Sequence, residues 1–363
     1  MPAPQWVRLF GNAAGAAAAS ASARLPVARS SHTVTAVAGH IAVFGGEDAP
    51  RNAFDRRLHL FGPDGMWRSA ATQLPGPALL GHAAASSSGS LFVFGGRTGG
   101  TVAFEGEGAS GGEETGKLYA CDVAAGAEAW TEPHTSAADR PEARSFHAMC
   151  AAPDSDRVGG RLFVFGGCGK AGRLNDLWAF DPDGGRWSCL FSGGSEGPKP
   201  RGGSALAAMR MPGGGERLVL MYGFSGQQQG DLAVFDTEKK RWELLPHEAQ
   251  RGDVPSPRSV FCSAPTPSGK SAIVFGGERV ESNAGHEGAG EFTADSYILD
   301  LETLAWRRLQ VEGEVPCPRG WSGCALLGGS IEASEPRIVL YGGLDASNTR
   351  LGDMWELRLH GFA

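Results

Sequence analysis

The sequence of 363 residues predicts an all-β fold, a single six-bladed β-propeller. One observation dominates: an apolar run that ends in an aromatic residue and glycine occurs six times along the chain. The six copies are Val43–Gly46, Val93–Gly96, Val164–Gly167, Met221–Phe224, Val274–Gly277 and Leu340–Gly343. From Phe44 to Tyr341 there are 341 − 44 = 297 residues, or about 59 for each of five intervals. A repeat of this length built from short strands is typical of propeller blades.

Each copy has the same companions, which separates a true repeat from chance glycine pairs. A start that contains Pro or Arg precedes the apolar run, and a strand such as 175–181, 232–236 or 296–300 follows it. In five copies a strand containing Trp comes last. Four β-rich segments bounded by turn residues predict one four-stranded antiparallel blade. The period with its loop insertions resembles that of kelch repeats. The predicted blades of this one domain, residues 1–363, are 29–70, 79–132, 144–190, 201–245, 258–309 and 319–359.

The sixth repeat lacks its tryptophan strand, because only four residues follow the segment that ends at Leu359. Residues 5–9, with Trp6 at their centre, have the composition of the missing strand. A first strand that pairs with the last blade would close the ring and cover an exposed sheet edge. We therefore expect residues 5–9 to complete blade six.

Composition excludes several classes of protein. The 55 glycines and 22 prolines indicate a turn-rich globular chain, and no apolar stretch approaches the length of a membrane span. A net charge of −7 argues against nucleic acid as a main partner. Seven cysteines without a Cys-x-x-Cys pair predict reduced thiols in an intracellular protein.

The N-terminus allows two interpretations. Residues 1–30 contain Arg8, Arg24 and Arg29 and no acidic residue, which is typical of an organelle transit peptide. The other interpretation makes Trp6 part of the closing strand, and cleavage would then remove that strand. We favour the closing strand and expect a cytoplasmic protein.

The repeats predict where function lies. In an antiparallel blade, the start of the first strand and the end of the second meet at one edge, so these positions share one face of the ring. The first set consists of the repeated arginines, among them Arg144, Arg258 and Arg319, with Phe146 and Trp321 nearby. The second set, taken as the residue after each glycine pair, is Glu47, Arg97, Cys168, Ser225, Glu278 and Leu344.

The opening of the ring on this face, called the mouth below, would be rich in arginine. Such a mouth suits an anion, since guanidinium groups present forked donors that match sulfate or carboxylate. The alternative is that the repeated arginines bind backbone carbonyls and hold the ring together, which we expect for Arg201. For Arg97, outside the repeated start, both roles remain open. Glu278 and His286 share one polar loop in the fifth repeat, and their carboxylate and imidazole suit Fe(II), Mn or Zn.

The chain also resembles the plant specifier proteins, a family of kelch propellers that includes nitrile-specifier, epithiospecifier and thiocyanate-forming proteins. The resemblance runs nearly end to end and is carried by the segments 28–32, 44–48, 141–147, 257–261 and 319–321. It implies an Fe(II) centre held by Glu, Asp and His after the fifth glycine pair. Glu278 and His286 fall on the first and third ligand positions, whereas Ser282 stands where that family has Asp. Because serine is a poor ligand for iron, three alternatives follow: Glu281 reaches in from the adjacent position, water fills the site, or this chain has lost the centre.

The same resemblance implies a substrate and roles for the mouth residues. It predicts conversion of glucosinolate aglycones, which are thiohydroximate-O-sulfates, toward nitriles by a lyase-type reaction. Arg97 would act on the leaving sulfate, and Glu47, Arg144, Phe146, Arg258, Arg319 and Trp321 would bind substrate. The alternative is a non-catalytic kelch module that holds a protein or a small anion at the same mouth.

Overall fold

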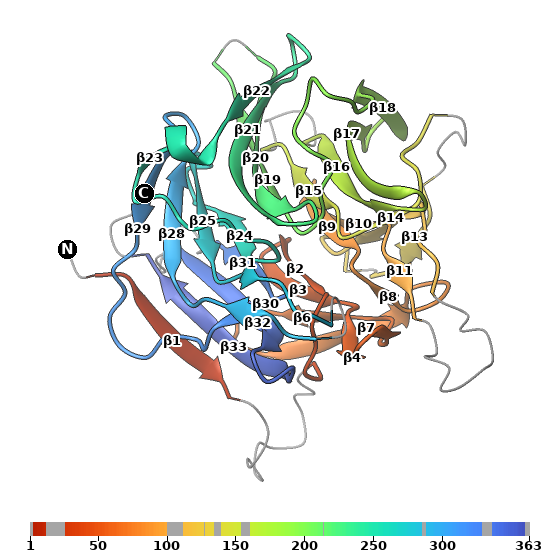
Figure 1. Cartoon of the computed structure of the whole chain (residues 1–363). Coiled ribbons are helices and arrows are strands. Elements are labelled where there is room, and N and C mark those ends of the chain that lie inside the picture. The colour runs from red at the N-terminus through yellow and green to blue at the C-terminus, as the bar shows by residue number, and fades with distance from the viewer. Residues whose placement is uncertain are drawn as a thin grey trace, which may run out of the picture.

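In the described residues, strand pairing forms six mainly antiparallel sheets of four or five strands, arranged around a common axis as Figure 1 shows, and three two-stranded sheets. The computed structural model describes residues 3–11, 26–99, 112–126, 128–133, 139–153, 160–212, 214–284, 288–328 and 336–359. The prediction of an all-β, six-bladed propeller is confirmed. A single short 3-10 helix, η1 (His247–Ala249), is the only helical element among these residues.

Blades one to three each run from an inner strand at the axis to an outer strand at the rim. Blade one consists of β2 (Thr33–Val37), β3 (His40–Phe44), β6 (Arg57–Phe61) and β7 (Trp67–Gln73). Blade two consists of β9 (Ala83–Ser87), β10 (Ser90–Phe94), β12 (Leu118–Asp122) and β13 (Trp130–Thr131). Blade three consists of β15 (Ala148–Ala151), β16 (Leu162–Gly169), β17 (Gly172–Asp181) and β18 (Arg186–Phe191).

Blades four to six repeat this order. Blade four consists of β19 (Ala205–Arg210), β20 (Glu216–Phe224), β21 (Gln228–Asp236) and β22 (Arg241–Leu245). Blade five consists of β24 (Cys262–Pro265), β25 (Ser271–Phe275), β28 (Ser296–Asp300) and β29 (Ala305–Arg308), and β23 (Arg251–Gly252) pairs with its outer strand. Blade six consists of β31 (Gly323–Leu327), β32 (Arg337–Asp345), β33 (Arg350–Arg358) and β1 (Gln5–Phe10).

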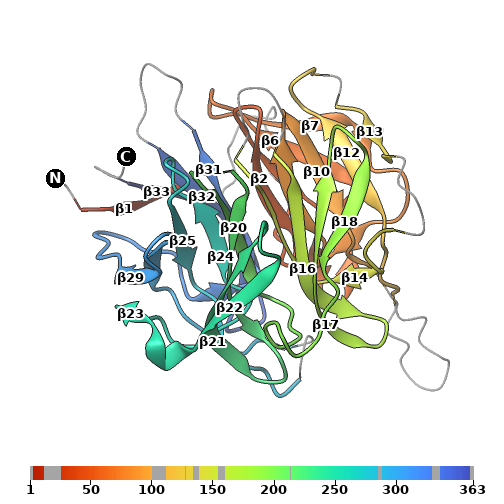
Figure 2. The same ribbon diagram turned by 90° about the horizontal axis from the view of Figure 1, so that it is seen from above.

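Short strands gather at one end of the ring. They lie next to the glycine pairs that follow the second strand of each blade, called the glycine steps below. They are β4 (Glu47–Ala49), β5 (Asn52–Ala53), β8 (Leu79–Leu80), β11 (Arg97–Thr98), β14 (Arg144–Ser145), β26 (Glu278–Val280), β27 (Glu291–Phe292) and β30 (Arg319–Gly320). In Figure 2, which turns the ring by 90°, the long sheets stand side by side with their faces toward one another. Because each sheet is covered on both faces, its second strand is apolar without alternation, and Val43, Val93 and Val164 are fully buried.

Two rings of backbone hydrogen bonds join each blade to the next. In the first, the second residue of each glycine step donates its N–H to a carbonyl in the following blade, as Gly96 does to Arg144 (2.8 Å) and Gly343 to Arg29 (2.9 Å). In the second, six residues close a circle of N–H to carbonyl bonds of 2.6–3.0 Å around the axis. These six, called the axial ring below, are Ser31, Gly81, Phe146, Gly203, Val260 and Trp321.

Both rings contain residues with positive φ, a backbone conformation that residues other than glycine rarely adopt. All six residues of the axial ring have positive φ, and four of them are not glycine. At Gly46, where φ is +103°, an added Cβ would lie 2.6 Å from the Ser30 carbonyl oxygen. Glycine is therefore needed there for its conformation and for the close approach of the two segments.

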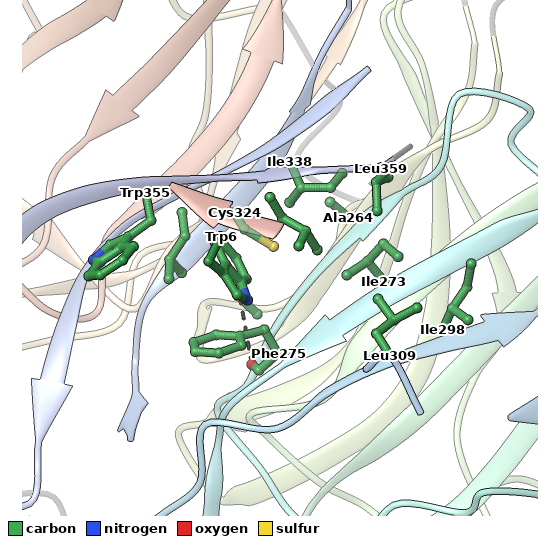
Figure 3. Packing of buried hydrophobic residues seen from close by; sticks show 13 residues of the cluster. Trp6, Ala264, Ile273, Phe275, Ile298, Leu309, Cys324, Ile338, Trp355 and Leu359 are labelled. Carbon is green, nitrogen blue, oxygen red and sulfur yellow. Dashed lines mark hydrogen bonds between the residues drawn. The ribbon is translucent and has the colours of Figure 1, made fainter. Parts of the chain in front are cut away.

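The N-terminal strand closes the ring, as the sequence predicts. β1 pairs antiparallel with β33, from Gln5 opposite Arg358 to Phe10 opposite Met354, and Figure 1 shows the red strand alongside the blue one. Trp6 is 2% exposed and packs at 5.1 Å against Phe275 of blade five (Figure 3). The same strand therefore completes blade six and buries its tryptophan against the neighbouring blade. Arg24, part of the transit-peptide interpretation, lies outside the described residues.

Replacing Trp6 tests this closure. Trp6→Ala removes a buried aromatic ring from the seam, so we expect the free energy of unfolding to fall by about 3–5 kcal/mol. Urea unfolding followed by circular dichroism measures it. Leu244→Ala, at a side chain that is half exposed on β22, is the control and should change stability by less than about 0.5 kcal/mol. Equal stability of both variants and the parent protein would contradict a closing role for β1.

Candidate functional site

The axial ring forms the floor of a hollow at one end of the propeller. Phe146 and Trp321 stand on opposite sides of this floor, and their rings meet edge to face with centroids 5.3 Å apart. Gly81 leaves room for the first of them, since a Cβ there would lie 2.6 Å from the Phe146 ring. The aromatic pair lines two neighbouring pockets, described below as the larger and the smaller pocket.

The larger pocket has a volume of about 120 Å³ and is bounded by blades three to six. Phe146, Phe224, Val260 and Trp321 form its apolar walls. Arg173 lies on one side, with its guanidinium 4.8 Å from the centre of the Phe224 ring. Glu278, Glu281 and Ser282 line the same pocket from blade five. A positive group and two carboxyl groups therefore face one largely apolar space.

The smaller pocket, of about 60 Å³, is bounded by blades one, two, three and six. Its polar side chains are Ser31, Glu47, Arg51 and Arg97, and its apolar ones include Leu80 and Leu344. Arg97 forms an ion pair of 3.0 Å with Glu114, and both side chains are part-exposed. Glu47 is buried and accepts hydrogen bonds from the hydroxyls of Ser30 and Ser31, both at 3.1 Å. The Arg97 guanidinium is thus held in place while it still faces the pocket.

The structure brings six of the predicted site residues to this mouth. They are Glu47, Arg97, Phe146, Glu278, Ser282 and Trp321. Their common location follows from the expected strand pairing: Ser30 bridges Glu47, Leu80 pairs with Arg97, and Ser259 bridges Glu278.

The repeated arginines have a different position from the one expected of ligands. Arg144, Arg258 and Arg319 are 0% exposed, and each binds both carboxylate oxygens of an aspartate in its own blade. The partners are Asp176, Asp295 and Asp353, respectively. Each guanidinium also donates at 3.0 Å to the carbonyl of the first glycine of its step.

This geometry corrects the expectation that Arg144, Arg258 and Arg319 bind substrate, because their donors are used inside the blade and none of them lines either pocket. Arg201 has the same arrangement with Asp231 and the Tyr222 carbonyl, in agreement with the structural role expected for it. Burial opposes ionisation of Asp353, but its hydrogen bonds and the charge of Arg319 outweigh burial and lower its pKa.

Blade four requires a second correction. Tyr222, with φ of +57°, occupies the place of the first glycine, and Gly223 occupies that of the second. The residue after the step is therefore Phe224, which lines the larger pocket, rather than Ser225. Because Tyr222 is aromatic, the sequence analysis matched it to the residue before the first glycine, one position too early in the repeat.

Arg173 is the main residue that the sequence reasoning missed. It pairs with Cys168 across the hairpin between β16 and β17, and that pairing carries it into the mouth. Among the ion pairs of the described residues, none includes Arg173. The signal that could have found it is the short Gly169–Gly172 turn, which places the fifth residue after Cys168 back beside it.

The predicted metal loop is described only in part. Glu278 is buried, and burial raises its pKa from 4.5 to about 7, with the Glu281 charge adding to this effect. The Ser282 hydroxyl accepts the Ala284 N–H at 3.1 Å. His286 lies outside the described residues, and those that are described contain no group of three metal-binding side chains.

Glu278 and Glu281 nevertheless fit half of a site for a hard divalent cation. Two carboxyl groups line one pocket, and one of them is held partly protonated by burial and by its neighbour, a cost that a bound cation would relieve. Ser282 contributes only a neutral oxygen that is already used in the turn.

Comparison with known proteins agrees with this architecture. Residues 31–277 match the family model described as the KLHDC2/KLHL20/DRC7 Kelch-repeats domain. The chain belongs to the Kelch-repeat family. It is also similar to the N-(sulfonatooxy)prop-2-enimidothioate sulfolyase of Thlaspi arvense, with 27% identity over 353 residues that cover 92% of this chain and 93% of that protein.

Other Kelch-repeat relatives match shorter regions. The host cell factor homolog hcf-1 of Caenorhabditis elegans is 27% identical over 55% of this chain, which spans 25% of that protein. Kelch domain-containing protein 1 of Mus musculus is 26% identical over 54% of the chain, and the match covers 50% of its length. In the described residues, no helix is long and apolar enough to cross a membrane.

Two arginine variants separate scaffold from mouth. Arg201→Ala leaves Asp231 without its partner, so we expect a loss of about 3–5 kcal/mol in the free energy of unfolding. Arg97→Ala removes a part-exposed ion pair and should cost less than about 1 kcal/mol. Urea unfolding of both variants measures the difference, and equal losses would show that Arg97 is also part of the scaffold.

The raised pKa of Glu278 predicts a pH dependence of stability. Between about pH 4.5 and 7 the folded protein holds more protons at Glu278 than the unfolded chain does, so this group lowers stability as the pH rises. Glu278→Gln stays neutral and should remove that loss. Melting temperatures from pH 5 to 8 should show the variant gaining on the parent as the pH rises, and a pH-independent difference would refute the assignment.

Proposed function

We propose that the protein is a specifier-like lyase that cleaves a thiohydroximate-O-sulfate at the propeller mouth and directs the product toward a nitrile. The observation that carries this proposal is the placement of two arginines around the aromatic pair: Arg173 shares the larger pocket with two carboxyl groups, and Arg97 lines the neighbouring smaller pocket. Similarity to a sulfolyase along nearly the whole chain supports the same reaction class.

Each part of the mouth has a task in this proposal. Guanidinium groups match the oxygens of a sulfate, so Arg173 and Arg97 bind the leaving group and stabilise the charge that develops on it. Phe146, Phe224 and Trp321 exclude water from the aglycone and hold its side chain. Glu47 contributes by fixing the segment after the first glycine step, where it binds Ser30 and Ser31.

Fe(II) is the proposed metal of this site, and Glu278, Glu281 and His286 are the residues that would hold it. Bound there, it would supply a Lewis acid for the substrate sulfur. Ser282 at the position of the family's aspartate weakens the ligand set, since a neutral hydroxyl holds a hard cation less well than a carboxylate does.

The test combines metal binding with product analysis. Protein purified without oxygen is titrated with Fe(II) and then mixed with a glucosinolate, a thioglucosidase and Fe(II). We expect nitrile to increase at the expense of isothiocyanate, and Ser282→Asp to bind Fe(II) more tightly and to increase nitrile further. An unchanged product ratio with both proteins would overturn the lyase proposal.

Arg173→Ala tests the anion site separately. Loss of a charge-assisted hydrogen bond should weaken binding of inorganic sulfate roughly 10-fold, measured by calorimetry. Arg186→Ala, which removes the same charge from an exposed position in the same blade, is the matched control and should bind as the parent does. The parent protein could also bind sulfate and yet leave the nitrile-to-isothiocyanate ratio unchanged. In that case the better assignment is a non-catalytic Kelch module that holds an anion or a protein at this mouth.

A further inference from the structure

Two cysteines meet at the boundary between blades five and six. Cys262 begins β24 and Cys324 lies in β31, and these are the inner strands of the two blades. Both side chains are buried, with 3% and 7% exposure, and both belong to the core cluster that contains Trp6. Figure 3 shows Cys324 within this cluster, next to the seam closed by the N-terminal strand.

The two thiols share one core cluster across this boundary. The neighbouring Cys262 thiol and burial raise the pKa of Cys324 well above its ordinary value. Cys262 Sγ also donates to the Phe275 carbonyl at 3.7 Å. Both cysteines are free thiols in this structure. In the reduced protein the two thiols are therefore already neighbours, and they come from different blades.

The pair is also within reach of a small reagent. Cys262 and Cys324 line the same cavity, of about 190 Å³, which lies along the inner strands of all six blades. A water molecule occupies about 30 Å³ of liquid volume, so a molecule as small as hydrogen peroxide fits this space. A peptide-sized disulfide such as oxidised glutathione is much larger than a peroxide and is a poorer match.

We propose that Cys262 and Cys324 are an oxidation site at which hydrogen peroxide forms a disulfide between blades five and six. One thiolate attacks the peroxide, the O–O bond breaks, and a sulfenic acid forms with release of one water. The other thiol then displaces the hydroxyl as a second water and the S–S bond forms. In total the two thiols give up two electrons and two protons, which reduce one peroxide to two waters.

The chemistry of the pair determines the pace of this reaction. Because the thiolate is the nucleophile and the pKa of Cys324 is raised, oxidation is slow at neutral pH and faster at higher pH. The site therefore responds to sustained exposure to oxidant. The bond would close a loop of 324 − 262 = 62 residues and join the blade completed by β1 to its neighbour.

The experiment uses the full chain with Cys189 and Cys317 replaced by serine, since both are exposed and would react first. After incubation with hydrogen peroxide at pH 8, the protein is unfolded, alkylated and digested for mass spectrometry. We expect a cross-linked peptide that contains Cys262 and Cys324, two fewer alkylated thiols, and reversal by dithiothreitol. The melting temperature should rise by roughly 5 °C before reduction.

Single variants distinguish the proposed bond from general oxidation. Cys324→Ser and Cys262→Ala should each abolish both the cross-link and the rise in melting temperature. Recovery of both cysteines in alkylated form after prolonged treatment would overturn the proposal, as would conversion of either one to a sulfinic acid without a cross-link. The same conclusion would follow if one of them formed a disulfide with a different cysteine. None of these outcomes depends on lyase activity at the mouth.

Discussion

The arginine at the start of five of the six repeats connects the two levels of this structure, the single blade and the ring. Within the blade its guanidinium binds an aspartate and the carbonyl of the first residue of the glycine step, as Arg144 does with Asp176 and Gly166. Between blades its own carbonyl accepts the N–H of the preceding glycine step, as Arg144 does from Gly96. A buried charge of this kind is tolerated because its aspartate and carbonyl partners satisfy it.

This constraint also decides which side chains are available for chemistry. The donors of the buried arginines are used in hydrogen bonds within the blades. The charged groups of the mouth therefore lie at neighbouring positions. Glu47, Arg97 and Glu278 follow the glycine steps, and Arg173 arrives across a hairpin. The axial ring adds Phe146 and Trp321, whose positive φ angles are imposed by the circle of hydrogen bonds. The scaffold and the site are therefore built from adjacent residues.

Blade two shows how far this arrangement can vary. Leu79 stands where the other blades have arginine, and its carbonyl still accepts the Gly46 N–H at 2.9 Å. The ring thus needs the carbonyl at this position, whereas the guanidinium contributes to the individual blade. Function can change in the same way, because residues on a shared scaffold differ from one family member to the next. In the proposed iron site Ser282 is such a position, because its neutral hydroxyl is a weaker ligand for a hard cation than a carboxylate is.

The sequence alone determined the number of blades, the closing role of Trp6 and the face on which the candidate site lies, because strand periodicity and glycine steps are local signals that repeat. It also placed Glu47, Arg97 and Glu278 on one mouth, since antiparallel pairing brings the ends of neighbouring strands together. It could not decide whether Arg258 or Arg319 faces a ligand or an aspartate, because the partner lies over 30 residues away. Only the tertiary structure decided that question, found Arg173 and Phe224, and brought Cys262 to Cys324, because contacts between distant segments depend on how blades pack and leave no local pattern.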